Sequence, residues 1–120
     1  MFRFCNPNPC NILVGDCVIR ACSIALDTDW KTVHKDICDL SRERCNMPSA
    51  NSVWAEYLHL NGFEQMPVLR PCTVRQFCRL HPTGIYVLGI GDHVVTVIDG
   101  DYYDIWDSGD EFVQYYFRKE

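Results

Sequence analysis

The sequence predicts an α+β domain in which N-terminal helices pack on a C-terminal antiparallel sheet of three to four strands. Apolar residues recur at helical spacing before Gly84, whereas short apolar runs separated by turn residues follow it. The chain has 120 residues, 48% of them hydrophobic and 22% charged, which is typical of one globular domain. Because no repeat, linker or low-complexity tract divides the chain, we expect a single domain, residues 1–120.

Four helices are expected in the first two thirds of the chain. Residues 1–15 contain two Asn-Pro pairs and are predicted to form a loop. Three of the helices begin near a residue that can cap the first turn, namely Asp16, the Thr28-Asp29 pair and Thr73, and the third helix ends at Asn61-Gly62, a typical helix end. The predicted helices cover residues 16–26, 28–40, 53–60 and 73–80.

The strands are expected after Gly84. The runs "IYVLGI", "HVVTVI" and "YYDIWD" predict three strands, and "EFVQYYFR" predicts a fourth. "DGD" between the second and third runs is a hairpin loop. The predicted strands cover residues 85–90, 93–98, 102–107 and 111–118.

Charge and hydropathy exclude several classes of partner. The net charge is −5 and no run of Lys and Arg occurs, so neither nucleic acid nor an anionic membrane is expected to bind. No apolar stretch approaches the roughly 18 residues of a membrane span. The start of the chain lacks the apolar region of a secretory signal, so we expect a cytoplasmic protein.

The eight cysteines do not form a recognisable metal motif. Their spacings lack a pair of zinc knuckles, with only Cys5 and Cys10 near the allowed range, and the acidic residues between 99 and 111 lack EF-hand spacing. A secreted disulfide scaffold would need a signal peptide. We therefore expect no metal and no cofactor, and mostly reduced, buried thiols.

Cys17 is the candidate nucleophile. It falls in the first turn of a predicted helix, where free backbone N–H groups and the helix dipole stabilise a thiolate. The neighbouring charge of Asp16 opposes this, so a histidine is needed. Cys22 falls on the buried face of the same helix and is expected to be inert.

His93 is the candidate base, because it opens an apolar strand directly after the Gly91-Asp92 turn. The other three histidines are most simply surface residues. If "DGD" is a three-residue loop, Ile98 pairs with Tyr102 and His93 lies opposite Asp107, with Cβ atoms about 5 Å apart. Asp107 is then the preferred residue to orient His93. Asp104 is the second choice.

Asn11 is the candidate oxyanion donor, six residues before Cys17. Its amide and the backbone N–H of Cys17 could together bind the negative oxygen that forms when a thiolate attacks a carbonyl. Each of these residues also has a structural explanation: a filler thiol, a hydrogen-bonded histidine at a strand end, a turn asparagine, and a solvated acidic hairpin.

The order Asn11, Cys17, His93, Asp107 resembles the papain-like cysteine peptidases, in which an amide residue also precedes the nucleophile by six positions. The "DC" before a helix and the short chain look closest to double-glycine leader peptidases and to small papain-like proteins of bacteria and their phages. Asn replaces the usual Gln, Val18 replaces an aromatic residue, and residues 28–82 carry no matching motif.

The resemblance implies a papain-like fold and a cysteine peptidase or isopeptidase that acts on a peptide or protein through an acyl-enzyme. It also implies a bacterial cytoplasm, or a host cytoplasm for a phage protein. Two alternatives remain open: a non-catalytic binding or inhibitor module, and a Cys-dependent acyltransferase or deamidase. The sequence does not choose a substrate or an oligomeric state.

Overall fold

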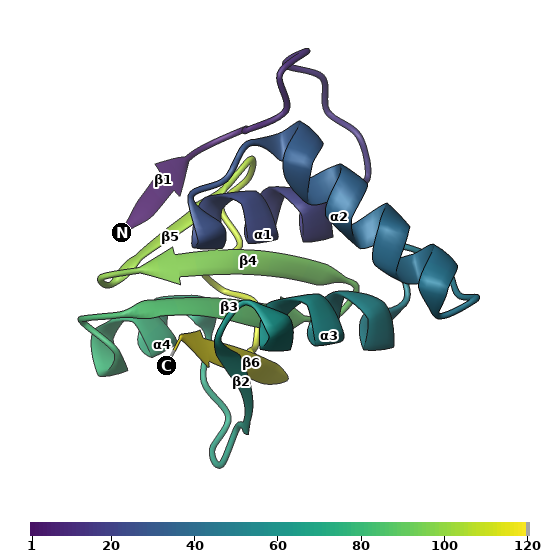
Figure 1. Ribbon diagram of the computed structural model, residues 1–120. Helices are drawn as coiled ribbons and strands as arrows, with labels where there is room; N and C mark the ends of the chain where they lie inside the picture. The colour runs from purple at the N-terminus through teal and green to yellow at the C-terminus, as the bar shows by residue number, and fades with distance from the viewer. Residues whose placement is uncertain (120) are drawn as a thin grey trace.

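Four helices and six strands make up the fold in the computed structural model, which describes residues 1–119 (Figure 1). Only Glu120 of the predicted domain lies outside the described residues. The elements, in chain order, are β1 (Phe2–Phe4), α1 (Cys17–Leu26), α2 (Trp30–Glu43), α3 (Asn51–Leu60), β2 (Phe63–Pro67), α4 (Val74–Leu80), β3 (Ile85–Ile90), β4 (His93–Ile98), β5 (Asp101–Asp104) and β6 (Tyr115–Lys119).

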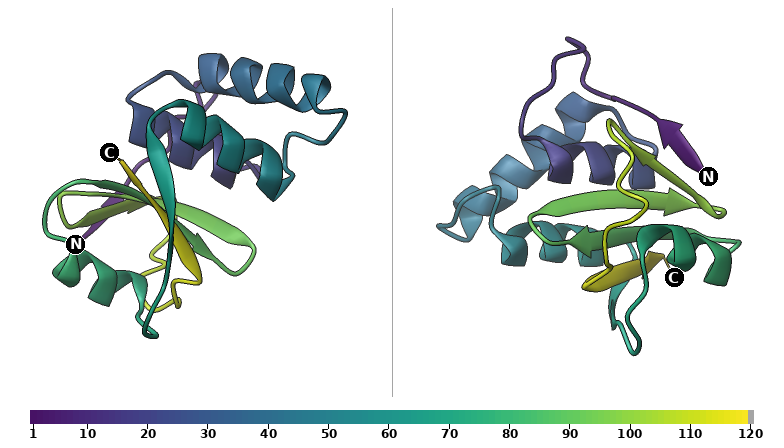
Figure 2. Two further views of the ribbon diagram at one scale, coloured as in Figure 1. Left: turned by 60° about the horizontal axis from the view of Figure 1, so that its bottom comes forward. Right: turned by 180° about the vertical axis from the view of Figure 1, so that it is seen from behind.

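The strands form one mixed sheet in the order β1-β5-β4-β3-β6-β2. The pairings are antiparallel except that of β1 with β5, which is parallel. Helices α1, α2 and α3 cover one face of the sheet, and α4 lies on the other (Figure 2). Neighbouring residues of β4 show the two sides: Val94 packs in the cluster with α1 to α3, whereas Val95 packs in the cluster with α4.

The fold is α+β, but the predicted arrangement is wrong. The sheet has six strands rather than three to four, and the helices do not all precede it, since β1 comes before α1 and β2 lies between α3 and α4. The two missed strands are the edges of the sheet. β1 has only three residues, and in β2 only Phe63 is buried, so neither carries an apolar pattern that periodicity could detect.

Helix positions follow the predicted caps closely. The Asp29 side chain accepts a hydrogen bond from the Thr32 N–H at 3.1 Å, and Thr73 forms a reciprocal capping box with Gln76. α1 begins at Cys17 as expected, although its Asp16 does not cap it with a side-chain hydrogen bond. None of the described helices is long and apolar enough to cross a membrane.

The β4–β5 hairpin is one residue tighter than predicted. Asp99 and Gly100 both have positive φ, 49° and 83°, as in the two-residue type I′ turn that Asp-Gly favours. Ile98 therefore pairs with Asp101, not with Tyr102. The three-residue loop was wrong, and the shift changes which acidic residue reaches His93.

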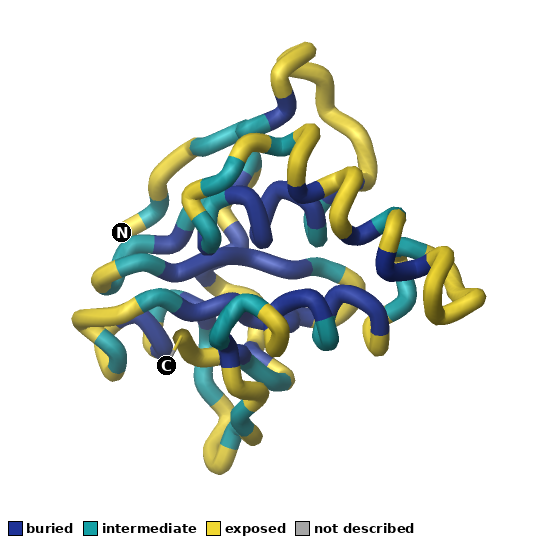
Figure 3. Tube along the Cα trace, in the orientation of Figure 1, coloured by how far each residue is buried: buried dark blue, intermediate teal, exposed yellow. Residues whose placement is uncertain are grey.

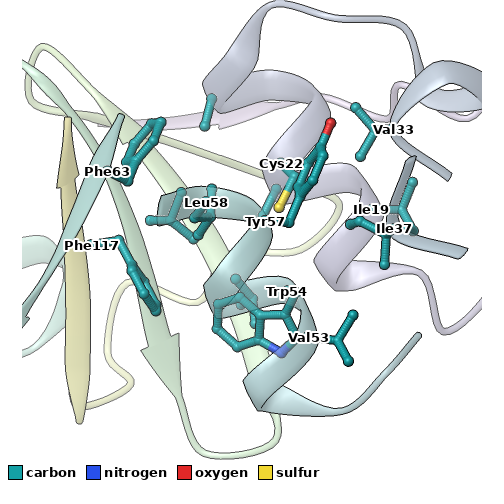
Figure 4. Close-up of a cluster of buried hydrophobic side chains, with 14 of the residues drawn as sticks. Ile19, Cys22, Val33, Ile37, Val53, Trp54, Tyr57, Leu58, Phe63 and Phe117 are labelled. Carbon is teal, nitrogen blue, oxygen red and sulfur yellow. The ribbon is translucent and has the colours of Figure 1, made fainter. Parts of the chain in front are cut away.

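The larger core fills the space between α1 to α3 and the sheet. Figure 4 shows Cys22 of α1 among Ile19, Tyr57 and Leu58. The backbone of β4 is buried over most of its length, whereas the loop from residue 9 to residue 15 is exposed (Figure 3). This core fixes α1 against β4, which is the contact that the candidate site needs.

Candidate functional site

The start of α1 and the start of β4 bring Cys17 and His93 together. α1 is anchored to the strand by the fully buried Thr96, whose hydroxyl donates to the Ala21 carbonyl at 2.6 Å. The His93 imidazole and the backbone N–H of Val94 are the neighbouring groups that act most strongly to lower the pKa of the Cys17 thiol. The thiol thus sits between an imidazole and a strand amide.

Asp104, at the end of β5, orients the imidazole. Its Oδ2 lies 2.6 Å from Nε2 of His93, which leaves Nδ1 as the ring nitrogen available to Cys17. The carboxylate is 2% exposed and is itself held by the Ile105 N–H at 2.7 Å and the Ser108 hydroxyl at 3.3 Å. A buried, hydrogen-bonded carboxylate behind an imidazole is the third member of a nucleophilic triad.

The electrostatics favour a thiolate paired with an imidazolium. Burial works to raise the pKa of Cys17, but hydrogen bonding with His93, the His93 charge, the Val94 N–H and the charge of Arg20 together lower it below its usual value. Burial likewise disfavours the charged form of His93. Hydrogen bonds with Asp104 and Cys17, and their negative charges, outweigh it and raise the pKa of His93 to about 9.

A buried ion-pair network removes the objection that Asp16 would repel a thiolate. The Asp16 carboxylate pairs with Arg20 and accepts a hydrogen bond from Trp30 Nε1 at 2.8 Å. The same guanidinium reaches Asp104, with its Nη2 3.6 Å from Oδ1 of Asp104. Because Asp16 is neutralised in this way instead of capping α1, its charge does not act alone on Cys17.

Asp107 does not orient His93, so the preferred assignment was wrong. Its carboxylate accepts hydrogen bonds from the Tyr102 hydroxyl and from the Gly109 N–H, and its side chain is 50% exposed. These bonds, with Arg75 nearby, lower the pKa of Asp107. The cause is the hairpin register: the observed pairing, continued past β5, sets Trp106 opposite His93 and makes Asp104 the diagonal neighbour. The Trp106 and His93 ring centroids lie 5.0 Å apart.

Asn11 is not brought to the site. It lies in the exposed loop before α1, with φ 54°, and its N–H donates to the Asn8 carbonyl at 2.9 Å to close a turn. Among the described residues, those lining the cavity around Cys17 begin at Val14 and do not include Asn11. The predicted oxyanion donor is therefore wrong, since spacing along a loop does not fix where the loop goes.

A cavity of about 700 Å³ opens in front of Cys17 and His93. Trp30 and His34 form one wall as stacked rings 4.9 Å apart; His34 is exposed, as expected, but it also lines this cavity. Tyr115 of β6 forms another part of the wall. These three residues were missed, because nothing in their local sequence places them beside Cys17. The lining comes from residues 14–19, Trp30, His34, Cys38, 47–49, Asn51, 91–94 and Tyr115.

Of the other cysteines, Cys38 lines the same cavity, with its Sγ 3.9 Å from the ring nitrogens of His34, whereas Cys22 has no such neighbour among the described residues. Cys22 is fully buried, and burial together with the nearby Cys17 raises its pKa to about 12. Within residues 1–119 no group of three or more His, Cys, Asp or Glu side chains is placed to hold a metal ion. A second cavity, also of about 700 Å³, contains Cys72 and His81. There the His81 ring stacks on Phe77 and its Nδ1 contacts the Phe77 carbonyl at 3.0 Å, so both the ring face and this nitrogen are occupied by contacts with Phe77.

Comparisons with protein-family models, with curated proteins and with solved structures found no match for this chain. The function is therefore inferred from the geometry of Cys17, His93 and Asp104.

Proposed function

We propose that the protein is a cysteine hydrolase that cleaves a peptide or isopeptide bond through an acyl-enzyme. The observation that carries the proposal is the His93–Asp104 contact of 2.6 Å behind a thiol whose pKa is lowered. A structural cysteine has no need of an oriented imidazole. The earlier resemblance to papain-like peptidases belongs to this proposal, with Asp104 in place of Asp107.

The chemistry follows from the three side chains. The Cys17 thiolate attacks the carbonyl carbon, a C–S bond forms and the carbonyl oxygen becomes an oxyanion. As the C–N bond breaks, the His93 imidazolium gives its proton to the leaving amine. His93 then takes a proton from water, which attacks the thioester, releases the acid and restores the thiolate. Asp104 holds the ring with Nε2 toward itself throughout.

The cavity supports a substrate of peptide type. Two of its lining residues, Val14 and Met47, are apolar and at least 46% exposed. The stacked Trp30 and His34 rings present a flat wall. No Lys or Arg lines the cavity among the described residues, so a phosphate-bearing substrate is not favoured.

Acylation of the protein by p-nitrophenyl acetate tests the proposal. We expect a rapid burst of nitrophenolate, an acetyl group on Cys17 by peptide mass spectrometry, and slower turnover. Cys17→Ala should abolish the burst, whereas Cys10→Ala, which removes an exposed cysteine, should leave it unchanged. A burst that survives Cys17→Ala, or a wild-type protein that shows none, contradicts the proposal. In the second case the cavity would serve binding.

A further inference from the structure

The ring of Tyr115 lies across Gly89 on the face of the sheet that α1 covers. Gly89 of β3 pairs with Tyr115 on one side and with Val94 on the other. A Cβ atom added to Gly89 would stand 2.3 Å from Cζ of Tyr115, closer than any real contact. The ring therefore extends from β6 over the glycine toward β4, and a glycine inside this strand is what permits the approach.

The row of paired residues Tyr115, Gly89 and Val94 leads from β6 toward the residues beside Cys17. Val94, the next strand residue in this direction, follows His93, and its backbone N–H is one of the groups that lower the pKa of Cys17. Tyr115 lines the same cavity as Cys17 and His93. Since Cζ, the carbon that carries the hydroxyl, is the ring atom nearest to Gly89, the hydroxyl end of the ring lies over β3 and away from its own strand.

Packing fixes the ring but leaves its hydroxyl available. The ring meets Phe117 edge-on, with centroids 6.1 Å apart, and lies 6.2 Å from the Trp54 ring. In the described part of the chain the Tyr115 hydroxyl is not engaged by another hydrogen-bonding group. Burial, and secondarily the negative charge of Cys17, raise the pKa of Tyr115, so the phenol keeps its proton at neutral pH.

We propose that the Tyr115 hydroxyl is a further catalytic group, which donates a hydrogen bond to the substrate carbonyl oxygen as it becomes an oxyanion. It takes the role expected of Asn11, with the Cys17 backbone N–H in the first turn of α1 as the second donor. The inference rests on the proposed hydrolase function, since an oxyanion forms only if Cys17 attacks a carbonyl.

Two probes of the same thiol separate this role from an effect on the thiolate. Iodoacetamide alkylates Cys17 without forming an oxyanion, whereas p-nitrophenyl acetate must form one. We expect Tyr115→Phe to keep the alkylation rate within about twofold and to slow acylation by about 10²-fold, the effect of one lost oxyanion donor. Tyr116→Phe is the matched control, because this neighbouring tyrosine lines the second cavity. Thermal unfolding of both variants checks that the fold is kept.

The outcomes distinguish the two proposals. Acylation of Tyr115→Phe at the wild-type rate overturns the role of Tyr115 and leaves the hydrolase proposal standing. An equal loss of alkylation and acylation rates also overturns the role of Tyr115 as an oxyanion donor, since Tyr115 would then act on the reactivity of the Cys17 thiolate itself. A wild-type protein that is alkylated at Cys17 but not acylated overturns the hydrolase proposal, and this inference with it.

Discussion

Arg20 and Asp104 lie side by side beneath the candidate site, with a guanidinium nitrogen 3.6 Å from a carboxylate oxygen. Their side chains are only 5% and 2% exposed, and the same guanidinium also pairs with the buried Asp16. One arginine thus pairs with two buried carboxylates, those of Asp16 and Asp104. Removing it would leave Asp16 without its ion-pair partner and would take a second positive group from Asp104, which keeps His93.

We expect Arg20→Met to destabilise the fold by about 3–5 kcal/mol, the cost of breaking a buried ion pair from one side. Urea unfolding measures this loss. Arg118→Met is the control, because Arg118 forms a half-exposed pair with Glu64 at the sheet edge and should change stability little. Equal stability of the two variants would show that water reaches the carboxylates of Asp16 and Asp104.

Asp104→Asn and Asp107→Asn form a matched pair that tests the orienting residue. An amide at 104 cannot hold the His93 ring in the same protonated form, so we expect acylation or hydrolysis to fall by about 10²–10⁴-fold. Asp107→Asn weakens a contact with Tyr102 and should leave the activity within about twofold, because His93 is untouched. A larger loss in Asp107→Asn than in Asp104→Asn would contradict the assignment.

The acid that orients His93 is the part of the triad that the sequence did not predict correctly. The first turn of α1, the strand that begins at His93 and the hairpin after it are all visible as local patterns, and the structure has all three. The choice of the acid that orients His93 depended on the length of the hairpin loop. Asp99-Gly100 predicts a two-residue loop more strongly than "DGD" predicts a three-residue loop, because both residues adopt the positive φ of a type I′ turn. A change of one residue in register exchanged Asp107 for Asp104.

Other parts of the site are formed only by tertiary contacts. Arg20 sits on the buried face of α1, where its neighbours depend on how β5 ends, and Tyr115 lines the cavity of Cys17 from β6, a strand that does not pair with β4. The one local signal for Tyr115 was Gly89, an isolated glycine in an apolar strand, which indicates a close approach by another group. The edge strands β1 and β2 left no such signal.

Cys17 should be alkylated first among the eight cysteines. At about pH 6 its thiolate fraction exceeds that of an ordinary thiol because its pKa is lowered, whereas Cys22 is buried with a pKa near 12. Limited iodoacetamide followed by peptide mass spectrometry identifies the labelled residue. Cys10 is exposed and serves as the internal reference for a cysteine that the reagent can reach but that His93 does not activate. Faster labelling of Cys10 would show that exposure, rather than His93, decides reactivity.

Gly89→Ala should destabilise the fold by about 1–3 kcal/mol, because the new methyl group would overlap the Tyr115 ring. Tyr115→Ala in the same chain should recover part of this loss, since it removes the ring that clashes. A double-mutant cycle by urea unfolding gives the coupling between the two positions. Additive effects would mean that the ring moves aside freely and that its position over Gly89 is not enforced.

The pH dependence of the ion pair tests the electrostatics directly. Cys17 is a thiolate above its lowered pKa, and His93 is an imidazolium below about pH 9, so the pair exists between these two values. Nitrogen chemical shifts of the His93 ring should therefore titrate near pH 9, and the thiolate absorbance, taken as wild type minus Cys17→Ala, should appear at a lower pH than that of an ordinary thiol. Because Asp104 contributes to the raised pKa of His93, Asp104→Asn should move the His93 titration downward, toward the usual value of about 6.5. A purely structural Asp104 would leave that titration where it is.

The stability of the fold should depend on pH in the same range. Since the folded pKa of His93 is raised, the stabilisation that His93 contributes is complete below about pH 6.5 and is lost as the pH rises through about 9. A His93 that titrates near its usual value in the wild-type protein would remove the electrostatic basis of the proposed mechanism.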